Sequence, residues 1–532
     1  MNRAVLVCLL ALSSAFAQQT DNKPDRLEWF RDQGFGLFIH WSFDSQLGVV
    51  ISHSMAGASD DYNQRFLTEL PKTFNPRKFA PDDWASLARL AGIKYVVFTT
   101  KHHSGFAMWD TKTTPFSIMN TPFKRDINRE ILDAFRRQGI APGIYFSPDD
   151  FSWLHQNKID IQRNTPQVAP ANNPGLMKLD LAQVRELMTN YGPIDVVFFD
   201  GPPEQLKELA WKLQPNTVVT RGAIQTPELY VPGVPLPGAW EANFTMGTAW
   251  QYQPQNDAYK SGGTVIDLLV ETRAKGGNLL LNIGPKPDGE LPIEQEERLR
   301  EVALWMFVNQ EAIYATRPWV ITNEQNIWFT KAKNADTLYA VVKQEPRWVR
   351  SQWRDFILKS VQATDKTQVS VLGQNGSVLE YRPEVNPAPT FHQEADGLHV
   401  RAMFTHRLQD NSKWPNPIVL KLTNVKPAFV PPHVETTRAT LDKATGTATL
   451  EGRLADLGKS SSLEVGFQYR SIVGLDASDR SIPWLPAGSL TLSAPGPFTL
   501  KLPGLQANGI YEFRAFVKHP LLTLYGADQR IR

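Results

Sequence analysis

Cysteine is almost absent from this chain, because Cys8 is the only one among 532 residues. It lies in an N-terminal segment with the pattern of a secretory leader: Arg3, an apolar stretch over 4–12 and a small-x-small triplet ending at Ala17. We expect cleavage after this triplet, with 1–17 as signal peptide and Gln18 as the first mature residue. The mature chain would then have no thiol, which excludes disulfides, zinc–thiolate sites and cysteine nucleophiles. The pattern predicts a secreted or periplasmic bacterial protein.

An excess of charge of one sign is also missing. The formal net charge is +2, from 56 Lys and Arg against 54 Asp and Glu. No basic tract is interleaved with aromatic residues, so the sequence predicts neither nucleic acid nor an anionic membrane surface as a partner. After residue 17 no apolar run is long enough to span a bilayer. The hydrophobic content of 42% predicts a globular protein, and the length of 532 residues predicts more than one domain.

Strand and helix patterns alternate from about residue 25 to 320. Continuous apolar runs predict buried strands, and apolar positions at helical spacing predict the helices between them. The expected strands span 36–41, 95–103, 143–147, 194–200 and 217–221, and the expected helices span 81–92, 127–138, 179–191 and 206–213. Such alternation predicts a parallel sheet covered by helices.

Most of these strands end in residues able to do chemistry, namely His40, His102 with His103, Tyr145, Asp200 and Arg221. A closed barrel gathers such ends around one mouth, whereas a doubly wound sheet spreads them along a crevice. We therefore predict a (β/α)₈-like TIM barrel over 18–320, although eight clean repeats cannot be counted.

The sequence pattern changes after about residue 320, where short strand-like segments separated by turn residues replace the helical periodicity. The expected strands include 328–330, 338–342, 369–372 and 418–422. This pattern predicts C-terminal all-β sandwich domains at 321–430 and 431–532, separated by a proline-rich linker over 426–432. The segment 509–517 resembles a late strand of a fibronectin type III or immunoglobulin-like sandwich. Glycan-binding platforms in these domains are a further hypothesis, with candidates Trp348, Trp353, Trp414 and Trp484.

Asp200 follows four large apolar residues, 196–199, and precedes a glycine. Because desolvating a carboxylate is costly, packing alone does not explain an acid at the end of a buried strand. We predict a catalytic carboxylate here. The alternative is an ordinary turn or cap residue.

Glycoside hydrolysis requires a second carboxylate, set about 5 Å from the first in a retaining enzyme. Glu241 is the preferred acid/base, because we expect it in a loop beside Trp240, whose ring would raise the pKa of the carboxyl group. Asp149, Asp150, Glu204 and Glu271 remain alternatives, and the Asp149–Asp150 pair also fits a solvated loop or a cap. Aromatic faces such as Trp41 and Trp240 beside polar groups are suited to sugar rings.

Histidine is concentrated in the first 155 residues, at His40, His53, His102, His103 and His155. The adjacent His102 and His103 point to opposite faces of a strand, so both face one ligand only if the strand has ended. A metal site is one alternative, but there is no paired-histidine helical motif and no third ligand at a characteristic spacing. We predict no metal. A histidine satisfied in the core is the other alternative for each of them.

Four motifs together resemble glycoside hydrolase family 29, the α-L-fucosidases. They are Phe38–Trp41, Thr100–Phe106, Tyr191–Gly201 and Lys275–Pro285, and Val308–Tyr314 resembles the last barrel helix of that family. The resemblance covers about residues 25–320. It implies a (β/α)₈-like barrel and a retaining enzyme that acts on fucosylated glycans without a metal or cofactor. Together with the leader segment and the two candidate carboxylates, it leads to the hypothesis of a secreted, exo-acting α-L-fucosidase.

The resemblance also implies roles for individual residues. The family's nucleophilic aspartate corresponds to Asp200, and the Trp–Glu pair makes Glu241 the best match for its acid/base. Its sugar-binding residues correspond to His40, His102, His103, Tyr145 and Arg221.

One segment departs from the family pattern. Typical members carry Glu-Trp-Tyr shortly after the His-Trp motif, whereas this chain has Ser52–Gly57 without that triplet. His53 is the residue expected to take over part of its role. The departure leaves a related sugar such as L-galactose as an alternative substrate, together with sulfated or branched fucosyl glycans. A carbohydrate-binding protein without activity is the alternative of a different class.

Overall fold

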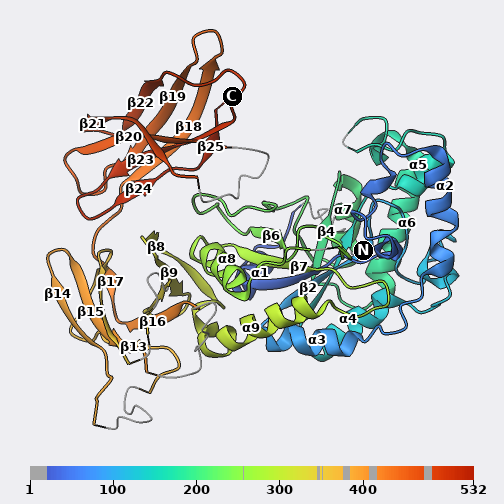
Figure 1. Ribbon diagram of the computed structural model, residues 1–532, viewed down its shortest axis with the longest axis horizontal. Coiled ribbons are helices and arrows are strands. Elements are labelled where there is room, and N and C mark those ends of the chain that lie inside the picture. The colour runs from blue at the N-terminus through green and yellow to red at the C-terminus, as the bar shows by residue number, and fades with distance from the viewer. Residues whose placement is uncertain are drawn as a thin grey trace, which may run out of the picture.

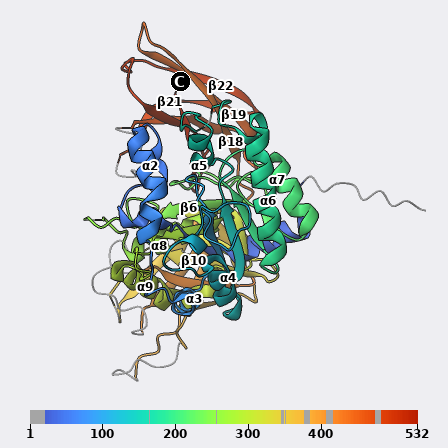
Figure 2. The same ribbon diagram turned by 90° about the vertical axis from the view of Figure 1, so that its right-hand side faces the viewer.

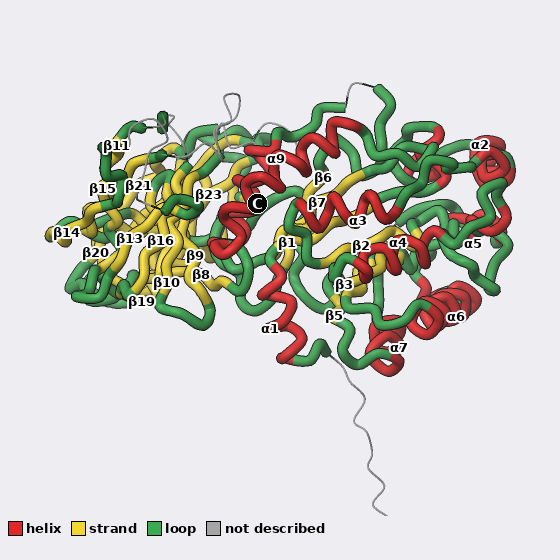
Figure 3. The backbone as a smooth tube through the Cα atoms, turned by 90° about the horizontal axis from the view of Figure 1, so that it is seen from below, coloured by secondary structure: helices red, strands yellow, loops and turns green. Residues whose placement is uncertain are grey.

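The computed structural model describes residues 21–531 except 164, 256, 344–347, 350, 376–383, 406–415 and 473–481. A parallel sheet covered by helices forms the N-terminal part, and antiparallel sheets form the C-terminal part (Figures 1 and 3). The leader-like segment 1–17 lies outside the described residues. Within the described part of the chain, none of the helices has the length and hydropathy needed to cross a membrane.

The parallel sheet has seven strands in the order β5-β4-β3-β2-β1-β7-β6. They are β1 (Phe35–Ile39), β2 (Tyr95–Lys101), β3 (Ala141–Phe146), β4 (Val196–Phe199), β5 (Val218–Val219), β6 (Glu241–Thr245) and β7 (Asn278–Ile283). Nearly every residue in them is buried, as expected of strands covered on both faces. The predicted TIM-like architecture is confirmed. In the described chain an eighth barrel strand is replaced by the segment 221–228, whose isolated bridges reach β6.

Helices cover the outside of the curled sheet. They are α1 (Pro24–Gln33), α2 (Asp60–Thr68), α3 (Pro81–Leu90), α4 (Ile127–Arg137), α5 (Phe151–Gln156), α6 (Pro174–Asn190), α7 (Glu204–Leu213), α8 (Gly262–Ala274) and α9 (Ile293–Asn309). The four helices expected from periodicity are α3, α4, α6 and α7, and α6 starts earlier than expected, at Pro174. Helices α6 and α7 pack side by side, as do α3 and α4 (Figure 2). The connection from β5 to β6 contains no helix and runs as a loop over 220–240.

Local sequence explains where α4 begins and ends. The Asp126 side chain accepts a hydrogen bond from the Arg129 amide and so caps the first turn. Ile131 and Phe135 share one face and are buried against the sheet. After the helix, Gly139 takes a positive φ of 70°, a conformation that favours glycine over any residue with a side chain.

The C-terminal part is antiparallel throughout, which confirms the all-β prediction. The first group comprises β8 (Thr316–Glu324), β9 (Ile327–Ala332), β10 (Thr337–Val342), β11 (Trp353–Leu358), β12 (Val361–Gln362), β13 (Gln368–Val371), β14 (Thr390–Glu394), β15 (Gly397–Met403), β16 (Ile418–Thr423) and β17 (Lys426–Pro427). The second comprises β18 (His433–Asp442), β19 (Thr447–Asp456), β20 (Leu463–Ser471), β21 (Leu485–Leu492), β22 (Gly496–Leu502), β23 (Tyr511–Lys518), β24 (Thr523–Tyr525) and β25 (Gln529–Arg530). Each group has its own apolar core.

The tryptophans proposed as glycan platforms differ in exposure. Trp348 is 2% exposed and packs against Phe356, so it is a core residue. Trp353 and Trp484 are partly exposed, and the Arg514 guanidinium lies 4.1 Å from the centre of the Trp484 ring. Trp414 lies outside the described residues.

A buried ion pair fixes α6 to the end of β2. The Lys101 ammonium lies 2.7 Å from Asp180 Oδ1 and 3.5 Å from Asp150 Oδ2, and neither Lys101 nor Asp180 is exposed. Burial raises the pKa of Asp180 to about 7, although the neighbouring ammonium opposes this shift. This lysine directly precedes His102 and therefore anchors the strand end that carries both adjacent histidines.

Lys101→Met should lower the free energy of unfolding by about 3–5 kcal/mol at pH 8, because it leaves buried carboxylates without a cation. The loss should shrink at pH 5. The pKa of Asp180 in the folded protein, about 7, lies above its ordinary value, so at pH 5 the folded protein keeps this carboxyl group protonated and it needs no cation. Its ionisation costs stability as pH rises from the ordinary value toward 7, and at pH 8 the ionised group depends on Lys101. Urea unfolding of variant and parent at both pH values measures this. Lys112→Met, which removes an exposed partner of Asp110, is the control and should change nothing measurable. An equal loss at both pH values would contradict the prediction.

Candidate active site

Asp200 lies at the centre of the barrel mouth, directly after β4, with its backbone amide donating to the Phe146 carbonyl. Its side chain contacts three hydrogen-bond donors and one further cation. The Tyr145 hydroxyl donates to Oδ2 at 2.8 Å and Arg221 Nη1 donates to Oδ1 at 3.0 Å. His103 Nε2 lies 3.1 Å from Oδ2, and Arg163 Nη2 lies 3.5 Å from the same oxygen.

These neighbours determine the ionisation of the carboxyl group. Burial alone would raise the pKa of Asp200, but the hydrogen bond from His103 and the charges of Arg221 and Arg163 hold it well below its usual range. Since a carboxylate can only accept, the His103 Nε2 atom carries the proton in this contact. Asp200 is therefore an ionised carboxylate, and such a group can act as a nucleophile.

The three strand-end histidines lie together at the same mouth. Strand β2 ends at Lys101, so the two following rings are released from strand alternation, and their centroids lie only 4.5 Å apart. The His102 ring stacks on Tyr145 at 5.3 Å. The His40 Nδ1 atom lies 2.6 Å from Asn282 Oδ1, and burial lowers the pKa of His40 to about 3. These imidazoles are neutral and suited to hydrogen bonds with hydroxyl groups.

The segment that departs from the expected motif also reaches the mouth. His53 begins the short 3-10 helix η2 (His53–Met55), and its ring centroid lies 5.3 Å from that of His103. Ser52 has a positive φ of 59°, and its hydroxyl lies 2.9 Å from His102 Nδ1. The sequence alone could not place this segment, because no regular pattern connects it to β2.

Glu228 is the carboxylate that sequence analysis missed. It lies on the loop after β5, where its Oε2 atom accepts a hydrogen bond from Arg221 Nη2 at 2.8 Å. The same guanidinium donates through Nη1 to Asp200, so one arginine joins the two acids. Side-chain exposure is 42% for Glu228 and 17% for Asp200. A signal was present in the sequence: Glu228 follows the strand-end Arg221 by seven residues without an intervening helix, at the catalytic end of such barrels.

Glu241 does not lie in a loop, in contrast to the expectation, but opens β6 and is fully buried. The Tyr95 hydroxyl donates to its Oε2 atom at 2.7 Å. Tyr95 pairs with Ala141, four residues before Tyr145 on β3, which corresponds to about 13 Å of strand. Since Tyr145 contacts Asp200, Glu241 belongs to the opposite, amino-terminal end of the barrel. Burial raises the pKa of Glu241 to about 7 without access to the mouth.

Both tryptophans expected to bind sugar are core residues. Trp41 is completely buried, packs against Phe79 and Trp84, and donates its indole N–H to the Lys286 carbonyl. Trp240 is 1% exposed, and its ring occupies the space that any side chain at Gly277 would need. A different, partly exposed tryptophan lies beside His40.

That residue is Trp250, which sequence analysis did not single out as a sugar-binding residue. Its ring centroid lies 5.0 Å from that of His40. Asn282 connects the two residues, because its amide nitrogen donates to the Trp250 carbonyl while its oxygen contacts the His40 ring.

The alternative acids have other positions. Asp149 is buried beside His103 and Arg163, and burial raises its pKa. Asp150 caps α5 by accepting from the Trp153 amide, as the cap interpretation predicted. Glu204 begins α7, and Glu271 pairs with Lys275 on α8.

The mouth therefore combines two carboxylates with one arginine between them and a wall of neutral imidazoles, a phenol and an indole. Such a set can bind a polyhydroxylated ring through its hydroxyl groups. One carboxylate is ionised and enclosed, and the other is open to solvent. An ionised, enclosed carboxylate can attack a carbon centre, and a solvent-exposed one can transfer a proton to a leaving group.

Comparisons with known proteins agree on one family. A family model described as alpha-L-fucosidase matches residues 7–311. Human plasma alpha-L-fucosidase is 30% identical over 420 residues, which cover 69% of this chain and 86% of that protein.

Solved structures extend the comparison to the fold. Alpha-L-fucosidase isoenzyme 1 from Paenibacillus thiaminolyticus is 26% identical with a TM-score of 0.59, and the match covers 75% of this chain and 98% of that one. The alpha-L-fucosidase from Vibrio sp. strain EJY3 is 20% identical with a TM-score of 0.66, and the match covers 97% of this chain and 99% of that one. The second similarity concerns the fold alone, and it includes the antiparallel sheets.

Proposed function

Because the chain belongs to the alpha-L-fucosidase family, glycoside hydrolase family 29, we propose that it hydrolyses terminal α-L-fucosyl residues of glycans with retention of configuration. The chain is a hydrolase of this family. The observation that supports the retaining mechanism is the Arg221 guanidinium, which binds Asp200 through one nitrogen and Glu228 through the other. Two carboxylates within the span of one guanidinium fit the short separation of retaining enzymes, about 5–5.5 Å.

In the first step Asp200 attacks the anomeric carbon of the sugar. The bond from this carbon to the glycosidic oxygen breaks, and Glu228 gives its proton to the departing oxygen. Asp200 is suited to the attack because its low pKa keeps it ionised. Glu228 is suited to proton transfer because its side chain is 42% exposed and can exchange protons with solvent.

In the second step a water molecule releases the sugar. The Glu228 carboxylate takes a proton from the water, whose oxygen attacks the anomeric carbon, and the ester bond to Asp200 breaks. Two inversions at one carbon give overall retention. Tyr145, His103 and Arg221 donate to Asp200 in the free enzyme and so stabilise the carboxylate when it departs.

The first test compares 4-nitrophenyl α-L-fucoside with 4-nitrophenyl α-L-galactoside, using the chain from Gln18 onward. We expect faster hydrolysis of the fucoside, because the chain belongs to the alpha-L-fucosidase family, although the Ser52–Gly57 segment departs from the family pattern. The two sugars differ by one hydroxyl group at C6, so the ratio of kcat/KM reports how this segment shapes the pocket. Preference for the galactoside would reassign the sugar but keep the mechanism, whereas binding of L-fucose without turnover of either compound would make this a carbohydrate-binding protein.

Export stays a prediction, because residues 1–17 lie outside the described part of the chain. The charged start, the apolar stretch and the small-x-small triplet support a secreted or periplasmic enzyme. Such a location suits an exo-acting hydrolase of glycans.

A further inference from the structure

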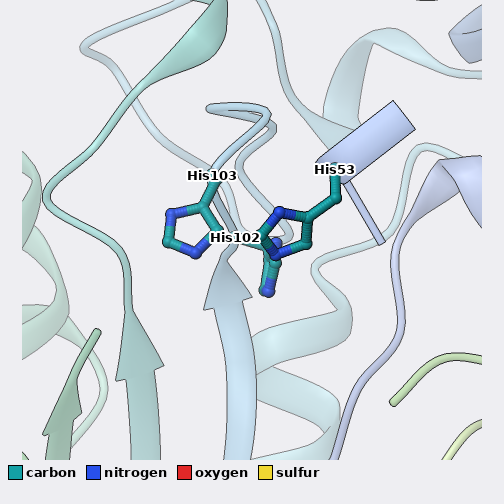
Figure 4. Close-up of side chains that lie close together, drawn as sticks. All are labelled: His53, His102 and His103. Carbon is teal, nitrogen blue, oxygen red and sulfur yellow. The ribbon is translucent and has the colours of Figure 1, made fainter. Parts of the chain in front are cut away.

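Three imidazoles gather beyond the end of β2. His53, His102 and His103 each offer one ring nitrogen, and these three atoms all lie within 4.8 Å of one another (Figure 4). We propose that these residues form a binding site for a divalent transition-metal cation such as Zn²⁺, which competes with the sugar for the barrel mouth. The sequence shows no third ligand at a characteristic spacing, and it is the fold that adds His53 to the adjacent pair.

The geometry is close to that of a three-histidine site. With Zn–N distances of about 2.0–2.1 Å, tetrahedral ligands lie about 3.4 Å from one another. Closing the present separations requires shifts of roughly an ångström, which ring rotations supply. His53 is the ligand best able to move, because it is only partly buried and begins a helix of three residues.

A hydrogen bond orients one of the rings from behind. The Ser52 hydroxyl lies 2.9 Å from His102 Nδ1, and it accepts a second hydrogen bond from the Ser104 amide, also at 2.9 Å. The contact occupies Nδ1 and leaves Nε2 available. Metal-binding histidines usually have such a partner on the second nitrogen, which fixes the ring orientation.

Carboxylates flank the third ring on both sides. His103 Nε2 lies 3.1 Å from Asp200 and Nδ1 lies 3.6 Å from Asp149, so a cation at Nε2 replaces the hydrogen bond to Asp200 and leaves the ring proton on Nδ1, beside Asp149. Arg163 opposes binding, because its guanidinium lies 3.3 Å from Asp149 and 3.5 Å from Asp200. The loop that carries Arg163 must shift for the cation to enter, which predicts moderate affinity.

Occupation of this site would block the proposed reaction. A cation beside His103 lies next to Asp200, so it shields the nucleophile and removes two donors for sugar hydroxyl groups. The inhibition rests on the proposed function, whereas the binding of the cation does not.

The test is a titration of the purified chain with Co²⁺, followed by visible absorbance in the absence of any sugar. We expect one equivalent of Co²⁺ to bind per chain with moderate affinity and to give the intense bands of four-coordinate Co²⁺, and we expect Zn²⁺ to displace it. His53→Gln should weaken binding at least 10-fold. The matched control is His399→Gln, which disrupts the other three-ligand group of the described chain, His392 with Glu394 and His399 on β14 and β15.

Activity and competition complete the test. Zn²⁺ should inhibit hydrolysis of the aryl fucoside competitively, and L-fucose should lower the apparent affinity for Co²⁺. The proposal is wrong if the absorbance survives in His53→Gln and disappears in His399→Gln, or if a saturating sugar leaves Co²⁺ binding unchanged. If the chain proves inactive on every glycoside, the absorbance titration still decides whether the site exists.

Discussion

Asp200→Ala should lower kcat/KM for 4-nitrophenyl α-L-fucoside by about 10⁴-fold or more, because it removes the group that forms the glycosyl intermediate. The prediction rests on the hydrogen-bond donors around Asp200. Tyr145, His103 and Arg221 all donate hydrogen bonds to this carboxylate and favour its ionised form. Its side chain is also more enclosed than that of Glu228. Initial rates of the purified variant and parent measure the loss.

Azide provides a stereochemical test of the same variant. The small anion fits the space that the deleted carboxylate leaves, and it attacks the anomeric carbon from that face. Azide should therefore restore turnover of the aryl fucoside and give the β-L-fucosyl azide, with inverted configuration. The proton coupling at the anomeric centre, measured by NMR, identifies the product. An α-configured azide would show that the nucleophile is still present and would exclude Asp200 from that role.

Asp149→Ala is the matched control, since Asp149 is also a carboxylate beside His103 and Arg163. It is buried behind the ring of His103 and should lose far less activity than Asp200→Ala. Melting temperatures of both variants show whether either is unfolded. Equal losses of activity in two folded variants would contradict the assignment of Asp200 as the single nucleophile.

Glu228→Gln and Glu241→Gln should behave in opposite ways. Glu228→Gln should lower kcat/KM by about 10²–10⁴-fold on a fucosylated oligosaccharide, whose leaving group needs a proton, and by much less on a nitrophenyl fucoside. Glu241→Gln should keep both activities, because the amide still accepts the hydrogen bond from Tyr95 at the far end of the barrel. Parallel kinetics on the two substrates measure the difference.

Two further measurements test the roles assigned to Glu228 and Glu241. With Glu228→Ala, azide should give the α-L-fucosyl azide, because it attacks the glycosyl intermediate on Asp200.

In Glu241→Gln the melting temperature should rise relative to the parent as pH increases from 5 to 8. The raised pKa of Glu241, about 7, means that its ionisation opposes folding and that stability is lost as pH rises toward that value. Loss of activity in Glu241→Gln alone would return the acid/base role to Glu241.

A barrel with catalytic strand ends was predictable from the sequence because local patterns determine it. Continuous apolar runs mark β1 to β4, and the strand-end position alone places His40, Tyr145 and Asp200 at one mouth. In a parallel sheet all carboxyl ends lie on the same side, so this inference needs no tertiary information. The motifs also identified the family, which the comparisons confirm.

The second carboxylate could not be chosen from the sequence, because the choice depends on contacts between segments distant from Asp200. Glu241 has an adjacent tryptophan, yet the register of β6 with β7 places it at the wrong end of the barrel. Glu228 has no such neighbour, and only the loop after β5 brings it to Arg221. Trp41 and Trp240 were misjudged for the same reason: composition cannot distinguish an indole in the core from one at the mouth.

The sequence by itself therefore determined the fold and the family and placed Asp200 at the end of a buried strand, since each depends on short patterns or on the polarity of one strand. Only the tertiary structure decided which acid shares Arg221 with Asp200, and that His53 joins His102 and His103. Those groupings arise where irregular loops converge, and no periodicity of the chain encodes the meeting of two loops.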